Sequence, residues 1–164
     1  MQPPQTSTVY LGLGSNLGDR RGSIAAAVSA LAAGALGDAH LSGLYETDAV
    51  ADEPQPPYLN AVIRGWTTLG PESLLARLLE IEAQLGRERP SGVRKAPRVI
   101  DIDLLLYADR VIDSPDLKVP HPALLTRAFV LIPLADVAAP GLVHPITAAP
   151  LTEAVPSRGV RRVA

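Results

Sequence analysis

The chain contains no cysteine, and only three of its 164 residues are histidines. The absence of cysteine excludes disulfide bonds and thiolate metal ligands. The histidines, His40, His121 and His144, lack the spacing of a zinc site. Any metal ion bound by this protein is therefore expected to be a hard cation with oxygen ligands.

Excess charge and long apolar segments are also missing. The 15 basic and 17 acidic residues give a formal net charge of −2, whereas general nucleic-acid binders rely on an extended positive surface. Residues 1–6 lack the features of a signal peptide, and no apolar run is long enough to span a bilayer. We therefore expect a soluble, cytoplasmic monomer that binds small molecules and neither nucleic acid nor a membrane.

Length and apolar content bound the domain organisation. With 164 residues, 47% of them hydrophobic, the chain is long enough for one domain with a substantial core and short for two. We expect a single domain over 1–164, with its core at about residues 8–140 and a frayed basic tail at 157–164.

Apolar periodicity predicts the elements of this domain. Asp19 or Ser23 caps the first helix, and Pro71 opens the second. A short return at 110–112 and a helical segment at 124–137, interrupted by Pro133, come last. The order strand, helix, strand, strand, helix, strand is typical of a ferredoxin-like αβ sandwich of the α+β class, a mostly antiparallel sheet with helices packed on it. These six elements are expected at 8–14, 19–34, 41–46, 58–68, 71–86 and 98–107.

Two aspartates interrupt the last of these strands. Side chains alternate along a strand, so Asp101 and Asp103 point the same way, with Cα atoms about 7 Å apart. Two carboxylates at that separation repel by about 2 kcal/mol at an effective dielectric constant near 20, and a divalent cation between them removes this cost. The loop at 86–98 before them carries five cationic residues and one acid. The pattern indicates a metal site beside a polyphosphate.

Simpler interpretations compete with this one. The aspartates could form the solvent face of an ordinary half-buried strand, although aspartate is disfavoured there because it competes for its own backbone. Gly12 and Gly14 could belong to a dinucleotide-binding turn, but Gly18 lies one position too late for the usual G-x-G-x-x-G pattern, and no Walker loop is present. These glycines are most simply positions where another segment or a ligand comes close.

Short motifs recur along the chain in a characteristic order. They are LGSNLGD at 13–19, YET at 45–47, YLN at 58–60, GRER at 86–89, PRVIDIDLLLY at 97–107, VPHP at 119–122 and RAF at 127–129. Together they resemble the 6-hydroxymethyl-7,8-dihydropterin pyrophosphokinase family. The resemblance implies a ferredoxin-like enzyme of folate biosynthesis. It also implies the reaction, transfer of pyrophosphate from ATP to the pterin hydroxymethyl group with release of AMP and the dihydropterin diphosphate.

The resemblance further implies roles on the ATP side. Asp101 and Asp103 match the ligands of two Mg²⁺ ions that bridge the triphosphate and the attacking oxygen. Arg87 and Arg98 match catalytic arginines that neutralise charge as the bond to AMP breaks, a task suited to bidentate guanidinium groups. The positions that match ATP contacts are Arg87, Arg89, Arg94, Arg98 and His121.

A second group of residues suits a flat heterocycle. Tyr58 and Asn60 lie two apart on one strand, so an aromatic ring and an amide point the same way. By the resemblance, Tyr58 and Phe129, the only phenylalanine of the chain, sandwich the pterin. Thr47 and Asn60 match positions that hydrogen-bond its edge, and Val50 matches one that offers backbone contacts.

Some positions depart from the family pattern. Lys95, Ala96 and Pro122 differ from the usual residues, and the basic loop is one residue longer than in some relatives. The resemblance therefore leaves open which loop arginine meets which phosphate. As a hypothesis, the loops at 48–57 and 87–97 close over both substrates and exclude water.

Two other classes of protein remain as alternatives. A nucleotide-binding oxidoreductase would hold a dinucleotide at the Gly12 turn. A non-catalytic ligand sensor with the same fold would bind a small molecule without consuming ATP.

Overall fold

The computed structural model describes the whole chain except residues 1, 50–52, 88–96, 154, 157 and 164. Within the described ranges, no helix is long and apolar enough to cross a membrane. The elements in chain order are β1 (Ser7–Ser15), α1 (Arg20–Gly34), β2 (Gly37–Leu41), β3 (Leu44–Thr47), β4 (Tyr58–Thr67), α2 (Pro71–Gln84), β5 (Asp101–Tyr107), β6 (Ile112–Asp113), β7 (Lys118–Val119), the 3-10 turn η1 (Leu124–Thr126), α3 (Ala128–Val137) and β8 (Arg161–Val163).

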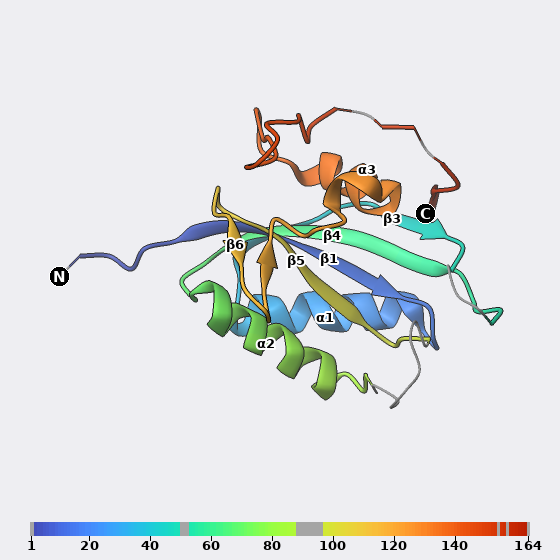
Figure 1. The fold of residues 1–164 in the computed structure, drawn as a ribbon. Coiled ribbons are helices and arrows are strands. Elements are labelled where there is room, and N and C mark those ends of the chain that lie inside the picture. The colour runs from blue at the N-terminus through green and yellow to red at the C-terminus, as the bar shows by residue number, and fades with distance from the viewer. Residues whose placement is uncertain (1, 50–52, 88–96, 154, 157, 164) are drawn as a thin grey trace.

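The main sheet has the strand order β5-β1-β4-β3-β8, with β2 also paired to β4. Every pairing in this sheet is antiparallel. Helices α1 and α2 cover one face and α3 covers the other (Figure 1). The expected α+β sandwich, an antiparallel sheet with helices packed on it, is confirmed. Strand β5, which carries the two aspartates, ends the sheet on one side.

Two apolar cores lie on the two faces of the sheet. The first joins the sheet to α1 and α2 and contains the fully buried Leu11, Leu31 and Leu78. The second lies beneath α3 and contains Leu124 and Leu134. The helices begin where the sequence predicts, since Asp19 caps α1 by accepting a hydrogen bond from the Gly22 amide at 3.0 Å and Pro71 opens α2.

A bulge in β5 changes which side chains face which core. Ile102 and Leu104 point into the first core, so Asp101 and Asp103 point to the opposite face. The pairing with β1 then shifts by one residue, which places both Leu105 and Leu106 in the second core. The face of β5 that carries the aspartates thus becomes apolar after Asp103. The polar part of this face is confined to the start of the strand.

Three expectations about the elements are wrong in detail. The strand expected at 41–46 is two strands, because the Ser42 hydroxyl accepts a hydrogen bond from the Val62 amide at 2.9 Å in place of a backbone carbonyl. The segment at 124–137 is interrupted at Arg127, and α3 runs through Pro133. The tail is not frayed throughout, because β8 at 161–163 pairs with β3.

Candidate active site

Two cavities of about 390 Å³ each meet at the start of β5. The first lies on the face covered by α3, and the second lies beside α2. Arg98, Asp101 and Asp103 line both of them. These three residues can reach both cavities because β5 is the last strand of the sheet, so its side chains and the loop before it border two faces. The predicted pair of aspartates is therefore shared by two candidate ligand sites.

Asp101 lies between two arginines. Its Oδ1 accepts a hydrogen bond from Arg87 Nη1 at 2.7 Å, and its Oδ2 accepts one from Arg98 Nη1 at 2.9 Å. The Asp101 side chain is 20% exposed and that of Arg87 only 8%, so the pair with Arg87 is largely removed from water. A desolvated charge pair of this kind fixes the position of both groups.

Asp103 is the second carboxylate of this pair, and its pKa is strongly shifted. Burial raises its pKa to about 7, and the negative charges of Asp101 and Glu82 act in the same direction, whereas Arg127 and Arg98 lower it. The repulsion between carboxylates that the sequence predicted is thus present. Asp103 binds a proton near neutral pH in the absence of another cation.

Glu82 is a site residue that sequence reasoning missed. It lies on the buried face of α2 with 2% of its surface exposed. Its Oε2 accepts hydrogen bonds from Arg87 Nη1 and, at 2.9 Å, from the Ile102 amide on β5. Burial raises the pKa of Glu82. The available signal was a carboxylate directly after Ile81 on the apolar side of a helix, where glutamate is rare unless paired.

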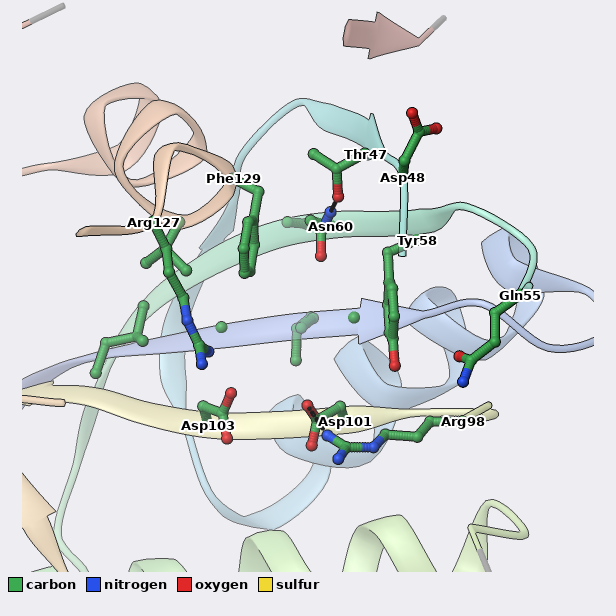
Figure 2. A pocket seen from close by; sticks show the side chains of 16 residues that line it. Thr47, Asp48, Gln55, Tyr58, Asn60, Arg98, Asp101, Asp103, Arg127 and Phe129 are labelled. Atoms are coloured by element: carbon green, nitrogen blue, oxygen red, sulfur yellow. Dashed lines mark hydrogen bonds and ion pairs between the residues drawn. The ribbon is translucent and has the colours of Figure 1, made fainter. Parts of the chain in front are cut away.

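Four of the five predicted pterin residues, all except Val50, lie together around the first cavity. The rings of Tyr58, from β4, and Phe129, from α3, project into it from opposite sides, with Asn60 between them (Figure 2). Asn60 Nδ2 donates to Thr47 Oγ1 at 3.0 Å. This bond leaves the amide oxygen of Asn60 available to the cavity, so the wall presents both hydrogen-bonding and aromatic groups.

The two glycines of β1 form the floor of this cavity. Gly14 lies in register between Asp101 on β5 and Asn60 on β4, and Gly12 lies beside Asp103. A Cβ atom at Gly14 would lie 3.4 Å from Asn60 Oδ1 and 3.6 Å from the Tyr58 ring. Because β1 continues to Ser15, these glycines lie inside a strand and not at the strand-to-helix turn that a dinucleotide site requires. They keep the space between the aspartates and Asn60 open.

Further residues of the first cavity come from the position just before α3 and from the connection between β3 and β4. The Arg127 guanidinium lies 5.6 Å from the centroid of the Phe129 ring and extends towards Asp103 (Figure 2). Asp48 and Gln55 line the opposite side. Sequence reasoning named none of these three as a site residue, although Arg127 belongs to one of the motifs.

Asn16 ties together the two segments that border the site. Its side-chain Oδ1 accepts a hydrogen bond from the backbone amide of Arg98 at 2.8 Å, and its backbone N–H donates to the Arg98 carbonyl at 3.0 Å. Its Nδ2 donates to Gln55 Oε1 at 3.0 Å and to the Pro56 carbonyl at 3.1 Å. Asn16 is 1% exposed. This buried amide therefore holds the start of β5 and the β3–β4 connection in fixed relation.

The second cavity contains the described residues that were predicted to contact ATP. Arg87, Arg98 and His121 line it, together with Lys118 and the apolar Leu75 and Leu79. Burial lowers the pKa of His121, and its Nδ1 accepts from the Ala123 amide at 3.1 Å, so the ring is neutral at neutral pH. The remaining predicted residues, Val50, Arg89 and Arg94, and the departures Lys95 and Ala96, lie outside the described residues.

The donor set limits what metal this site can hold. Among the described residues, no group of three or more histidine, aspartate or glutamate side chains is arranged to bind a metal ion. Asp101 and Asp103 thus provide two carboxylates at most. Mg²⁺ fits such a set, since it commonly binds one or two carboxylates and completes its shell with water and substrate phosphates.

Comparison with known proteins agrees with the motifs. Residues 10–139 match the family model described as 7,8-dihydro-6-hydroxymethylpterin-pyrophosphokinase (HPPK). A protein of Aquifex aeolicus named 2-amino-4-hydroxy-6-hydroxymethyldihydropteridine pyrophosphokinase is 41% identical over 155 residues, which are 94% of each chain. The Folic acid synthesis protein fol1 of Pneumocystis carinii is 42% identical over 139 residues, 85% of this chain and 18% of that protein.

Solved structures show the same fold. A crystal structure of a triple mutant of Plasmodium falciparum HPPK-DHPS superposes with a TM-score of 0.68 at 15% identity, covering 92% of this chain and 43% of that one. The chain thus spans less than half of this structure and about a fifth of the Pneumocystis protein, but nearly all of the Aquifex relative. From the family match and the Aquifex relative, we conclude that the chain belongs to the 7,8-dihydro-6-hydroxymethylpterin-pyrophosphokinase family.

Proposed function

We propose that this chain performs the reaction of its family by holding one substrate in each of its two cavities. The enzyme is an ATP-dependent pyrophosphokinase, which transfers pyrophosphate from ATP to the hydroxymethyl group of 6-hydroxymethyl-7,8-dihydropterin in folate biosynthesis. The observation that carries the proposal is that Arg98, Asp101 and Asp103 line both cavities. Groups of two bound substrates can meet only at such a shared wall.

The first cavity suits the pterin. A flat ring between Tyr58 and Phe129 gains stacking on both faces, and the arginine beside Phe129 extends the aromatic wall. Asn60 and Thr47 would hydrogen-bond its edge, since Asn60 retains an acceptor after donating to Thr47. Val50 remains a proposed backbone contact on the basis of the resemblance alone.

The second cavity suits the triphosphate of ATP. Arg87 and Arg98 supply guanidinium groups at its border with the first cavity, and His121 and the apolar residues of α2 complete the wall. Among the described residues, the buried Nε of Arg87 has no hydrogen-bond partner. A phosphate oxygen is the acceptor that such a donor favours. Arg89 and Arg94 are proposed as further phosphate contacts.

We further propose that Asp101 and Asp103 hold Mg²⁺, two ions in all, together with the phosphates. Bound Mg²⁺ would neutralise the triphosphate and lower the charge repulsion between the substrates. Both oxygens of Asp101 accept from arginines in the structure described here. Each carboxylate oxygen has a second lone pair, so Asp101 can bind a cation while it still accepts from these two guanidinium groups, which keeps positive charge beside the phosphates.

In the transfer itself, the hydroxymethyl oxygen forms a bond to the β-phosphorus while the bond between that phosphorus and the oxygen of AMP breaks. The hydroxyl proton passes to solvent water, and AMP leaves with the electron pair of the broken bond. The protein residues position the two groups and neutralise charge, because transfer of this kind needs little covalent participation by protein. The loops at 48–57 and 87–97 are proposed to close over the substrates, since Asp48, Gln55 and Arg87 line the cavities from these segments.

The test is an assay of purified protein with 6-hydroxymethyl-7,8-dihydropterin, ATP and Mg²⁺ in which AMP and ADP are measured separately. We expect AMP from the wild-type chain, and loss of AMP in Asp101→Ala and Asp103→Ala. The exposed Asp109 lies just beyond the same strand, so Asp109→Ala is the matched control and should retain activity. Formation of ADP, or full activity in either site variant, would contradict the proposal.

A further inference from the structure

Strand β8 lies beyond the part of the chain that matches the family model, which ends at residue 139. It pairs with β3, and the C-terminal end of the chain therefore lies beside this strand at the edge of the sheet (Figure 1). Strand β3 ends in Thr47, which lines the first cavity together with the next residue, Asp48. A segment outside the family match is thus in contact with an element of the proposed pterin site.

Arg161 of β8 provides the side-chain part of this contact. Its Nη2 lies 3.1 Å from Glu46 Oε1 and 3.6 Å from Asp48 Oδ1. Glu46 and Arg161 are also register partners on β3 and β8, so backbone pairing and the ion pair support each other. The two arginines on either side of Glu46 lower the pKa of its carboxyl group.

Arg20 carries the connection across to the other end of the β3–β4 segment. Its Nη2 lies 2.8 Å from Glu46 Oε2, and its Nη1 donates to the Pro57 carbonyl at 2.9 Å. Both ends of this segment, which supplies Asp48 and Gln55 to the cavity, are therefore joined through Glu46. Arg161, on the neighbouring strand β8, forms the second ion pair of Glu46.

We infer that β8 is a positioning element for the pterin pocket, in which Arg161, acting through Glu46 and Asp48, holds the end of β3 against the cavity. The inference rests on the proposed function of the first cavity. Arg161 is 52% exposed, so its ion pairs contribute little to global stability. Small displacements of a binding wall have a larger effect on ligand affinity, because the wall must match the ligand to within a fraction of an ångström.

The test compares Arg161→Ala with Arg162→Ala. Arg162 is the adjacent residue of β8, but its guanidinium lies over the Tyr45 ring at 5.9 Å, on the opposite face of the strand. We expect Arg161→Ala to raise the KM and the Kd for the pterin by about three- to tenfold, while the KM for ATP and the melting temperature stay near their wild-type values. Arg162→Ala should leave pterin affinity unchanged, and Arg161→Lys should restore part of it.

Other results of this comparison would contradict either the positioning role of Arg161 or the proposed function. Unchanged pterin affinity in Arg161→Ala, or equal losses for pterin and ATP, would overturn the positioning role. The same pterin loss in Arg162→Ala would show that the integrity of β8 matters and Arg161 does not, which also overturns it. Failure of the wild-type chain to form AMP would instead refute the proposed function, so the two failures are distinguishable.

Discussion

Asp103→Asn removes a buried carboxyl group whose ionisation opposes folding in the metal-free protein. Burial, with the charges of Asp101 and Glu82, raises the pKa of Asp103 from 3.8 to about 7. Between these values the folded state retains a proton that the unfolded state has released, so the free energy of unfolding falls as the pH rises. A difference of about 3 pKa units corresponds to roughly 4 kcal/mol, an upper bound because Asp101 shares the effect.

Urea unfolding in the presence of a chelator measures this contribution. Relative to wild type, Asp103→Asn should gain stability steadily from about pH 4 to about pH 7, and the gain should level off above that. Carboxyl groups remote from Asp103 contribute equally to wild type and variant, so the difference between the two proteins reports on Asp103 and the carboxyl groups beside it. Added Mg²⁺ should stabilise the wild-type chain and have less effect on the variant, because a cation replaces the proton.

Asp109→Asn is the matched control, since Asp109 is exposed in the turn after β5. It should follow the wild-type pH dependence. A difference between wild type and Asp103→Asn that does not change with pH would refute the reasoning, because it would show that the pKa of Asp103 is not raised in the folded protein.

Three further changes give distinct results. Glu82→Ala leaves Arg87 and the Ile102 amide without their buried acceptor, so urea unfolding should show a loss of about 3–5 kcal/mol, and a loss below about 1 kcal/mol would contradict the buried pair. Phe129→Ala removes one face of the pterin site, so titration should show about 10- to 100-fold weaker pterin binding with ATP binding unchanged, whereas equal losses would argue against a stacking role. Asn16→Ala should lower the free energy of unfolding by about 1–3 kcal/mol, because the Arg98 amide loses its side-chain acceptor, Asn16 Oδ1, and an unchanged midpoint would count against that role.

Much of the candidate site could be predicted from the sequence because it depends on local geometry. Strand alternation is enough to place Asp101 and Asp103 on one face, and the same rule places Tyr58 beside Asn60. Family motifs then supplied Phe129, which no local pattern distinguishes from an ordinary core residue. The roles of these residues remain proposals, whereas their arrangement around shared cavities is observed.

Other features depend on contacts between distant segments and could not be predicted. In the sequence, Glu82 looks like an ordinary residue of an amphipathic helix. Its role depends on the packing of β5 against α2, which brings the Ile102 amide to its carboxylate. Asn16 joins Arg98 to Gln55 across gaps in sequence of about 80 and 40 residues, respectively. The basic tail has the composition of a frayed end, yet β8 pairs with an edge strand that offers unpaired backbone groups.

The position of β5 in the sheet explains why one pair of carboxylates can serve two substrates. A central strand would expose each side chain to one face only, whereas the terminal strand borders α2 as well as the face beneath α3. The order of the strands in the sheet places the predicted metal ligands on this terminal strand. The bulge after Asp103 then turns Leu105 and Leu106 to the same face, which ends the polar region. Because β5 is the terminal strand of the sheet, Asp101 and Asp103 can line both cavities.

The products of a single reaction test the central claim most directly. The account predicts that pterin, ATP and Mg²⁺ give dihydropterin diphosphate and AMP in equal amounts, identified by mass spectrometry, because both substrates react at the wall formed by Asp101 and Asp103. A pterin monophosphate formed with ADP, or AMP formed together with free pyrophosphate and unmodified pterin, would contradict it.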